Sequence, residues 1–149
     1  MLAVGLGFIE AFEKVPGLGI DPEIACENSP TSITLSGITA AIVQTKALLD
    51  AENIFARELR TGQAYHSSHM KTVVLPFVTC PETACRTLSQ DDLEWRLLAT
   101  RMISSVTATE ITENDINSHY WAANLTSRVR FSEAITVLAK LLGWKISAQ

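Results

Sequence analysis

Two of the three histidines of this chain lie close together, in the segment from Ala64 to His69 (AYHSSH). Imidazole gains and loses a proton near neutral pH, so His66 and His69 are candidates for general acid–base catalysis. Two histidines three residues apart could also bind a metal ion from one face of a helix. Because no cysteine or carboxylate lies close in sequence to complete such a site, we expect no metal. On residue types alone, surface or hydrogen-bonded core histidines are the simpler interpretation.

The three cysteines offer a different nucleophile. Cys26, Cys80 and Cys85 are odd in number and include no C-x-x-C pair, so neither a zinc site nor a disulfide framework is predicted. We expect reduced thiols in a cytoplasmic protein. An enzyme that uses one of these thiols, with His66 or His119 as its base, stays open as an alternative. A cysteine nucleophile needs an activated environment, and the spacing of these residues does not supply one.

Short strands and helices alternate in the first part of the chain. Strands are predicted at residues 1–6, 24–26, 32–35 and 55–59, and helices at 8–14 and 38–50. In the second helix, Ile38, Ala41, Ile42, Thr45 and the pair Leu48–Leu49 fall on one face. The order strand, helix, strand, strand, helix, strand is that of a ferredoxin-like unit, a two-layer α+β arrangement.

The second part of the chain is less regular. We predict a helix at 69–75, capped by Ser68 and ended by Pro76. Ser89 and Asp92 resemble a capping box for a short helix that ends near residue 98. A buried strand is predicted at 102–106. A final helix at 132–142 is expected to bury four apolar side chains, which are Ile135, Leu138, Ala139 and Leu142.

Composition excludes several classes of function. Apolar residues make up 47% of the chain and charged residues 19%, which is typical of a globular protein. The net charge of −4, without any basic run, argues against nucleic-acid binding, because phosphate recognition needs clustered Lys and Arg. No stretch approaches the ~20 apolar residues that span a bilayer, so no membrane segment is predicted.

Five sequence blocks resemble the acyltransferase domains of fungal polyketide synthases. They occur in the family's order and cover residues 25–37 (ACENSPTSITLSG), 55–70 (FAREL followed by AYHSSHM), 104–107 (SSVT), 120–125 (YWAANL) and 129–134 (VRFSEA). One departure is Ala108, which stands where the family has glycine after SSVT. Residues 79–101 also fit the family poorly.

The resemblance implies transfer of a malonyl group from CoA to an acyl carrier protein. In the family a serine in a G-x-S-x-G elbow forms an acyl-enzyme, and the phosphopantetheine thiol of the carrier then takes the acyl group. His66 matches the catalytic histidine, whereas His69 matches a position without an assigned role. Asn124 matches the residue whose backbone carbonyl orients that histidine, although a simple structural role is nearly as plausible. Tyr65 matches a position linked to the choice of malonyl units, and ordinary core packing of Tyr65 is an equal alternative.

No G-x-S-x-G occurs in the 149 residues. By resemblance, the serine and the arginine that holds the malonyl carboxylate belong upstream of Met1, so we expect the isolated chain to be inactive. The predicted fold is α/β (α+β), with a ferredoxin-like small subdomain at 1–62 and an incomplete α/β-hydrolase-like large subdomain at 63–149. The segment itself is expected to bind no cofactor. Its implied partners are malonyl-CoA, the acyl carrier protein and other synthase domains. The alternative is a non-catalytic ferredoxin-like module that contacts the carrier or a neighbouring domain.

Overall fold

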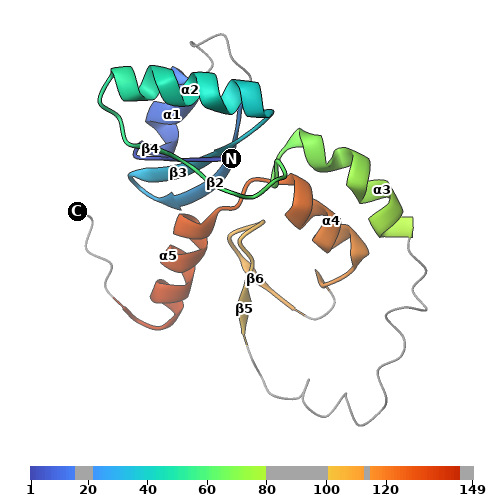
Figure 1. Ribbon diagram of the computed structural model, residues 1–149. Helices are drawn as coiled ribbons and strands as arrows, with labels where there is room; N and C mark the ends of the chain where they lie inside the picture. The colour runs from blue at the N-terminus through green and yellow to red at the C-terminus, as the bar shows by residue number, and fades with distance from the viewer. Residues whose placement is uncertain (16–21, 80–100, 113–114, 145–149) are drawn as a thin grey trace.

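The computed structural model describes residues 1–15, 22–79, 101–112 and 115–144. Its first part contains β1 (Leu2–Val4), α1 (Phe8–Lys14), β2 (Glu23–Ser29), β3 (Ser32–Ser36), α2 (Thr39–Ala51) and β4 (Ala56–Glu58). Its second part contains the 3-10 helix η2 (Ser68–Met70), α3 (Lys71–Thr79), β5 (Met102–Ile103), β6 (Glu110–Ile111), α4 (Ser118–Thr126) and α5 (Phe131–Leu141). Figure 1 shows both parts, coloured from blue at the N-terminus to red at the C-terminus.

The first part forms a four-stranded antiparallel sheet in the order β2-β3-β1-β4. The register pairs Leu2 with Leu35 and Val4 with Ile33, so apolar side chains of neighbouring strands face the same side. This element order and this strand order are those of the predicted ferredoxin-like unit. β1 lies in the centre of the sheet between β3 and β4 and does not pair with β2, the strand that follows it in sequence. The division of the chain at residue 62 stays a prediction.

Helices α1 and α2 cover one face of this sheet (Figure 1). Between these helices and the sheet lies a core of eight buried side chains, which are Leu2, Val4, Ala11, Val15, Ile33, Leu35, Ile42 and Leu49. In α2 the buried positions are Ala41, Ile42, Thr45 and Leu49, which share one helical face. Two of the residues predicted to share one helical face differ from the rest: Ile38 precedes the helix, and the side chains of Ile38 and Leu48 are exposed.

Two local predictions for the second part need correction. Helix α3 does not end at Pro76 but continues to Thr79. Proline disfavours a helix interior because it lacks a backbone N–H, yet α3 continues past it and packs against α4. The strand predicted at 102–106 is limited to β5, because the chain turns at Ser104, whose Oγ accepts the backbone N–H of Val106. The helix predicted from Ser89 to residue 98 lies outside the described residues.

The segment between α4 and α5 joins the two parts. The Val129 N–H donates to the Ala25 carbonyl across 2.8 Å, and the Glu27 N–H donates to the Val129 carbonyl across 2.8 Å. Val129 therefore extends the outer edge of β2 as a short parallel bridge with Cys26. This pairing satisfies backbone groups that an edge strand would leave open, and it fixes where α4 ends relative to the sheet.

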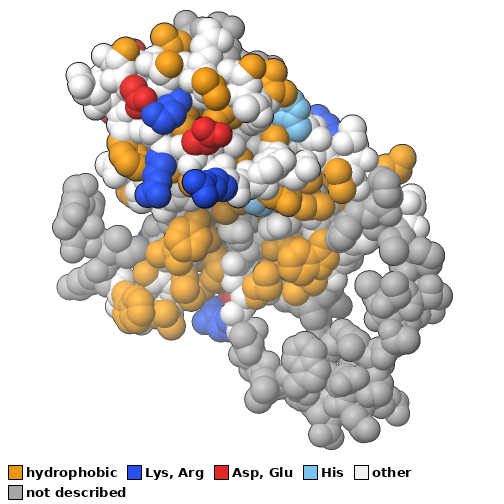
Figure 2. All heavy atoms as spheres, in the orientation of Figure 1, with side chains coloured by type: hydrophobic (Ala, Val, Ile, Leu, Met, Phe, Trp, Pro, Cys, Tyr) orange, Lys and Arg blue, Asp and Glu red, His pale blue; other side chains and the backbone are white. Residues whose placement is uncertain are grey.

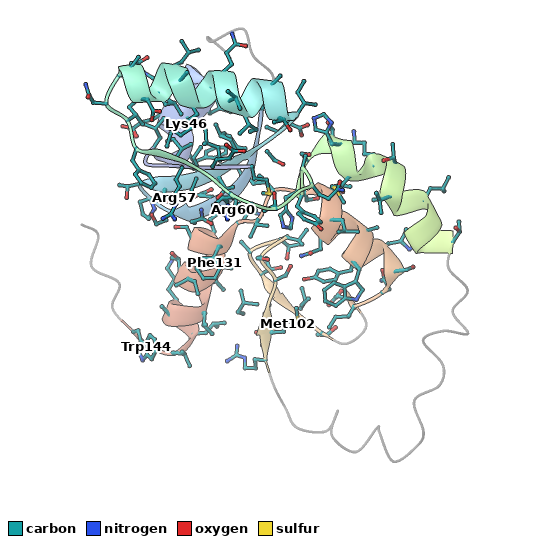
Figure 3. The ribbon with its side chains drawn as sticks, viewed as in Figure 1. Lys46, Arg57, Arg60, Met102, Phe131 and Trp144 are labelled. Atoms are coloured by element: carbon teal, nitrogen blue, oxygen red, sulfur yellow. The ribbon has the colours of Figure 1, made fainter. Side chains whose placement is uncertain are left out.

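Helix α5 forms near the predicted position, but its predicted burial is wrong for three of four side chains. Ala139 is buried, whereas Ile135, Leu138 and Leu142 are 43%, 37% and 53% exposed. Together with Phe131, at 49% exposed, they form one stripe along the helix at spacings of four, three and four residues. Hydrophobic side chains gather over α5 in Figure 2, and Figure 3 labels Phe131 at the start of α5 and Trp144 beyond its end. We call these four residues the α5 stripe.

Within the part of the chain that the structure describes, no helix is both long and apolar enough to cross a bilayer.

Candidate active site

His66 occupies the loop between β4 and η2 with an uncommon backbone conformation. Its φ is 57°, in the left-handed region that residues other than glycine rarely adopt. Such a conformation costs about 1–2 kcal/mol, so the surrounding contacts have to hold it in place. One of those contacts is the hydrogen bond from the His66 N–H to the carbonyl of Leu125, across 3.0 Å.

The imidazole of His66 faces a second carbonyl of the same helix. Its Nδ1 lies 2.8 Å from the backbone oxygen of Asn124. A carbonyl oxygen can only accept a hydrogen bond, so Nδ1 carries the hydrogen and Nε2 keeps its lone pair in the neutral ring. A histidine held in this tautomer can take a proton at Nε2.

The two carbonyls are available because α4 ends at Thr126. The last four carbonyls of a helix have no regular partner four residues ahead. Here the Val129 N–H, which would continue the helix to Leu125, donates to Ala25 instead. The C-terminal turn of α4 thus presents its free carbonyls to His66. At its other end α4 begins with Asn117, whose side chain accepts the N–H of Tyr120 across 3.0 Å.

The residues that follow His66 are fixed by hydrogen bonds of their own. Ser67 is fully buried, and its Oγ donates to the Ala64 carbonyl across 2.6 Å. The carboxylate of Glu23, at the start of β2, accepts the Ser68 N–H at 3.0 and 3.1 Å. It also accepts the Ser68 hydroxyl. Sequence analysis missed Glu23, because a contact between residues 45 positions apart has no local signal.

Tyr65 lies beside the catalytic candidate and is 38% exposed. Its ring centroid is 6.5 Å from that of His66, at an interplanar angle of 50°. This exposure argues against the alternative that Tyr65 is an ordinary core residue. The phenol therefore lies next to the imidazole and is partly open to solvent.

His69 is exposed and faces a different region of the surface. It lines a cavity of about 480 Å³ between the start of α2, the 58–64 segment and α3. His66 is not among the residues that line this cavity. The structure therefore gives the two neighbouring histidines different surroundings. Among the described residues, no group of three His, Cys, Asp or Glu side chains could hold a metal ion.

The cysteine alternative gains no support from the described cysteine. Cys26 is partly buried, and this burial raises the pKa of its thiol, while a hydrogen bond with Thr34 opposes the shift. A raised pKa leaves less of the nucleophilic thiolate at neutral pH. Cys80 and Cys85 lie outside the described residues, and His119 is exposed on α4.

Three of the sequence blocks meet at the turn that begins with Ser104. The buried Ser104 Oγ accepts the N–H groups of Val106 and Thr107 and also the hydroxyl of Tyr120, from α4, across 3.0 Å. Arg130, which precedes α5, donates its N–H to the Ser105 carbonyl and Nη1 to the Thr107 carbonyl. The turn is therefore hydrogen-bonded both to α4, the helix that presents Asn124, and to the residue that precedes α5.

Comparison with known proteins places the chain in a family. Residues 1–143 match the acyl transferase domain family. The chain is 42% identical over 141 residues to a highly reducing polyketide synthase of Preussia isomera. It is 41% identical over 147 residues to the prosolanapyrone synthase of Alternaria solani. These alignments cover 94% and 95% of this chain but 6% of each synthase, so the chain spans a small part of the relatives that it matches.

Solved structures share the fold. The acyltransferase domain from module 8 of the salinomycin polyketide synthase superposes with a TM-score of 0.75 at 22% identity, covering 94% of this chain and 31% of that one. The malonyl CoA-acyl carrier protein transacylase of Burkholderia pseudomallei gives a TM-score of 0.71 at 24% identity, covering 98% and 49%. The family match over nearly the whole chain and these shared folds agree with each other. The chain belongs to the acyl transferase domain family, and it resembles the acyltransferase domains of fungal polyketide synthases.

Proposed function

We propose that this chain supplies the general base of an acyltransferase site that moves a malonyl group from CoA to an acyl carrier protein. The observation that carries the proposal is the bond between His66 Nδ1 and the Asn124 carbonyl, which leaves Nε2 free to accept a proton. The nucleophile is a serine in a segment outside these 149 residues. The fungal synthases that the chain resembles and the transacylase with the same fold support this reaction class.

The proposed reaction has two halves. His66 Nε2 takes the proton of the serine hydroxyl as its oxygen attacks the malonyl thioester carbonyl. The bond to sulfur then breaks, and the CoA thiol leaves with the proton from the imidazolium. In the second half His66 takes the proton of the phosphopantetheine thiol, whose sulfur attacks the acyl-serine ester. The serine oxygen leaves and recovers that proton, so the site returns to its starting state.

Tyr65 is proposed to favour malonyl over bulkier acyl groups. The ring borders the space beside His66 and would crowd a methyl group on the α-carbon of the substrate. Excluding one methyl group changes the difference in activation free energy between two substrates by about 1–3 kcal/mol, so we expect a preference rather than an absolute selection.

The proposal includes no bound cofactor in this segment; CoA and phosphopantetheine enter as parts of the substrates. The proposed partners are malonyl-CoA, the acyl carrier protein and the neighbouring domains of a cytoplasmic synthase. The α5 stripe supports a partner of some kind, because four apolar side chains on one helix are a third to a half exposed.

The decisive experiment compares the chain alone with a fusion that carries the missing nucleophile. A serine-bearing segment from the acyltransferase region of the Preussia isomera synthase is placed ahead of Met1. Transfer from radiolabelled malonyl-CoA to a carrier protein is then measured. We expect no transfer above background from the chain alone and measurable transfer from the fusion. His66→Ala should reduce that transfer by at least about 100-fold, the usual contribution of a general base.

His69→Ala is the matched control, because it removes a nearby imidazole that does not contact Asn124 or Leu125. It should leave transfer within about twofold, as expected for a residue outside the reacting groups. A folded fusion that keeps full activity after His66→Ala would refute the proposal. Robust His66-dependent transfer by the chain alone would instead refute the need for an external serine.

The second candidate function is a non-catalytic module that binds the carrier protein or a neighbouring domain. The specific observation in its favour is the same α5 stripe, which offers an apolar docking surface. Titrating the 149-residue chain with carrier protein, before and after Ile135→Lys, separates the two functions. Binding that is lost with Ile135→Lys, together with an inactive fusion, would favour the module.

A further inference from the structure

The helix that follows His66 takes its N-terminal cap from a distant strand. η2 begins at Ser68 and leads directly into α3, and the first N–H groups of a helix have no partner within it. Ser67 precedes η2 and is of a residue type that often caps helices, but its Oγ donates to the Ala64 carbonyl and makes no cap. The Glu23 carboxylate instead accepts both the N–H and the hydroxyl of Ser68. A negative charge at this end also suits the helix dipole.

This cap lies two residues after the strained backbone of His66. With φ at 57°, His66 needs contacts on both sides to remain in that conformation. On one side, its own N–H is bonded to the Leu125 carbonyl. On the other side, the bonds from Ser68 to Glu23 fix where the chain goes after Ser67. If they were released, the loop could relax toward an ordinary φ and carry the ring away from Asn124.

The strand that carries Glu23 is also bonded to the segment that follows α4. β2 pairs with Val129 through Ala25 and Glu27, only three residues beyond the end of α4 at Thr126. One strand therefore fixes Ser68 through Glu23 and the C-terminal carbonyls of α4 through Val129. The distance between the imidazole and its acceptor carbonyl depends on these two attachments.

We infer that Glu23 is a positioning residue for His66: by capping the helix at Ser68 it keeps Nδ1 of the imidazole on the Asn124 carbonyl. The inference rests on the proposed role of His66 as general base, since only then does the choice of tautomer affect transfer. Glu23 itself bonds to Ser68 and acts on the site only through that contact.

The test is nitrogen-15 NMR of the imidazole groups in the complete 149-residue chain, at a pH where ordinary imidazole is neutral. The ring nitrogen shifts report directly which nitrogen carries the hydrogen. In the unaltered chain we expect the Nδ1–H form of His66 to dominate. Glu23→Ala should change the ratio of the two tautomers about fivefold toward Nε2–H, the effect of one lost hydrogen bond of ordinary strength. Glu23→Gln keeps one acceptor oxygen for the Ser68 N–H, so the tautomer ratio of this variant should stay close to that of the unaltered chain and shift only slightly.

Glu58→Ala is the matched control, because Glu58 is an exposed glutamate on β4 at the opposite edge of the same sheet. It should leave the His66 ratio unchanged. Ser68→Ala removes the hydroxyl donor alone and should give a smaller shift than Glu23→Ala. If the Glu23→Ala chain unfolds, Glu23→Gln and Ser68→Ala still test the inference, since both are expected to shift the ratio partially.

An unchanged His66 ratio in every folded variant of Glu23 and Ser68 would overturn the inference, as would an equal shift with Glu58→Ala. These measurements involve no acyl transfer. An inactive fusion protein would thus refute the proposed function while leaving the contact between Glu23 and the His66 loop as measured.

Discussion

The backbone oxygen of Asn124 and the Nδ1 of His66 lie 2.8 Å apart, so the imidazole is oriented by a peptide group and not by a side chain. A peptide carbonyl does not titrate, and substitution of the residue's side chain does not remove it. This arrangement differs from one in which a carboxylate holds the histidine.

It follows that Asn124→Ala should leave His66 unaffected. We expect the tautomer ratio of His66 to stay the same and the free energy of unfolding to change by less than about 0.5–1 kcal/mol, because alanine suits a helix well. Nitrogen-15 NMR and urea denaturation measure the two quantities. A large change of the tautomer ratio would show that the amide side chain, and not the backbone, holds the ring.

Ala108 adopts a backbone conformation that favours glycine. Its φ is 55°, and its N–H closes the turn by donating to the Ser104 carbonyl across 2.8 Å. A left-handed alanine is strained by about 1–2 kcal/mol. We expect Ala108→Gly to raise the free energy of unfolding by about 1 kcal/mol, which urea denaturation can measure.

The matched control for Ala108→Gly is Ala47→Gly, at an exposed position in the middle of α2. There glycine should lower the free energy of unfolding by about 1 kcal/mol, because helical φ values bring it no relief of strain. If both substitutions destabilised the chain equally, the turn at Ala108 would not be strained.

The α5 stripe should accept polar side chains, whereas the buried face of the same helix should not. Ile135 is 43% exposed and its neighbour Ala134 is 6% exposed. We expect Ile135→Lys to change the free energy of unfolding by no more than about 0.5 kcal/mol, as for most surface substitutions. Ala134→Lys should lower it by at least about 2 kcal/mol, because it places a charge in a packed interface.

Ile135→Lys should also reduce self-association and the binding of an apolar fluorescent dye, because it interrupts the α5 stripe. Light scattering and dye fluorescence provide these measurements. Unfolding caused by Ile135→Lys would mean that the stripe is packed against other parts of the chain in solution.

The Cys26 thiol should react slowly in the folded chain. Burial raises its pKa, against the opposing effect of the hydrogen bond with Thr34, so less thiolate is present at mildly alkaline pH than in the unfolded chain. Because the folded pKa lies above the unfolded value, the contribution of Cys26 to stability is fully present below the unfolded pKa. It is lost as the pH rises through the folded pKa.

Alkylation by iodoacetamide, followed at the peptide that contains Cys26, measures this protection. We expect the folded chain to react more slowly than the urea-unfolded chain at the same pH, with Cys80 and Cys85 replaced by serine in both. Equal rates would show that the thiol is neither buried nor shifted in its pKa.

The periodicity of apolar residues was sufficient to predict the elements of the four-stranded unit, but it was insufficient to predict which face of α5 is buried. The alternation of strands and helices up to residue 59, with apolar residues at the matching positions, predicted all six elements of the four-stranded unit. The same periodicity predicted α5 but assigned its apolar stripe to a core. A hydrophobic stripe shows that a helix has a preferred face; it carries no information on whether anything covers that face.

The sequence by itself determined which residues could do chemistry: it marked His66 through its residue type and its block, and it marked SSVT and the segment of Asn124 as blocks of the same family, without predicting the turn or the helix that these blocks form. Only the tertiary structure decided how these are held. The His66 backbone is strained, its ring rests on a free carbonyl at the end of α4, and a glutamate 45 residues from Ser68 caps the next helix. The physical reason is that sequence patterns report contacts within a few residues, whereas hydrogen bonds to backbone carbonyls and between distant segments depend on where the chain returns in space.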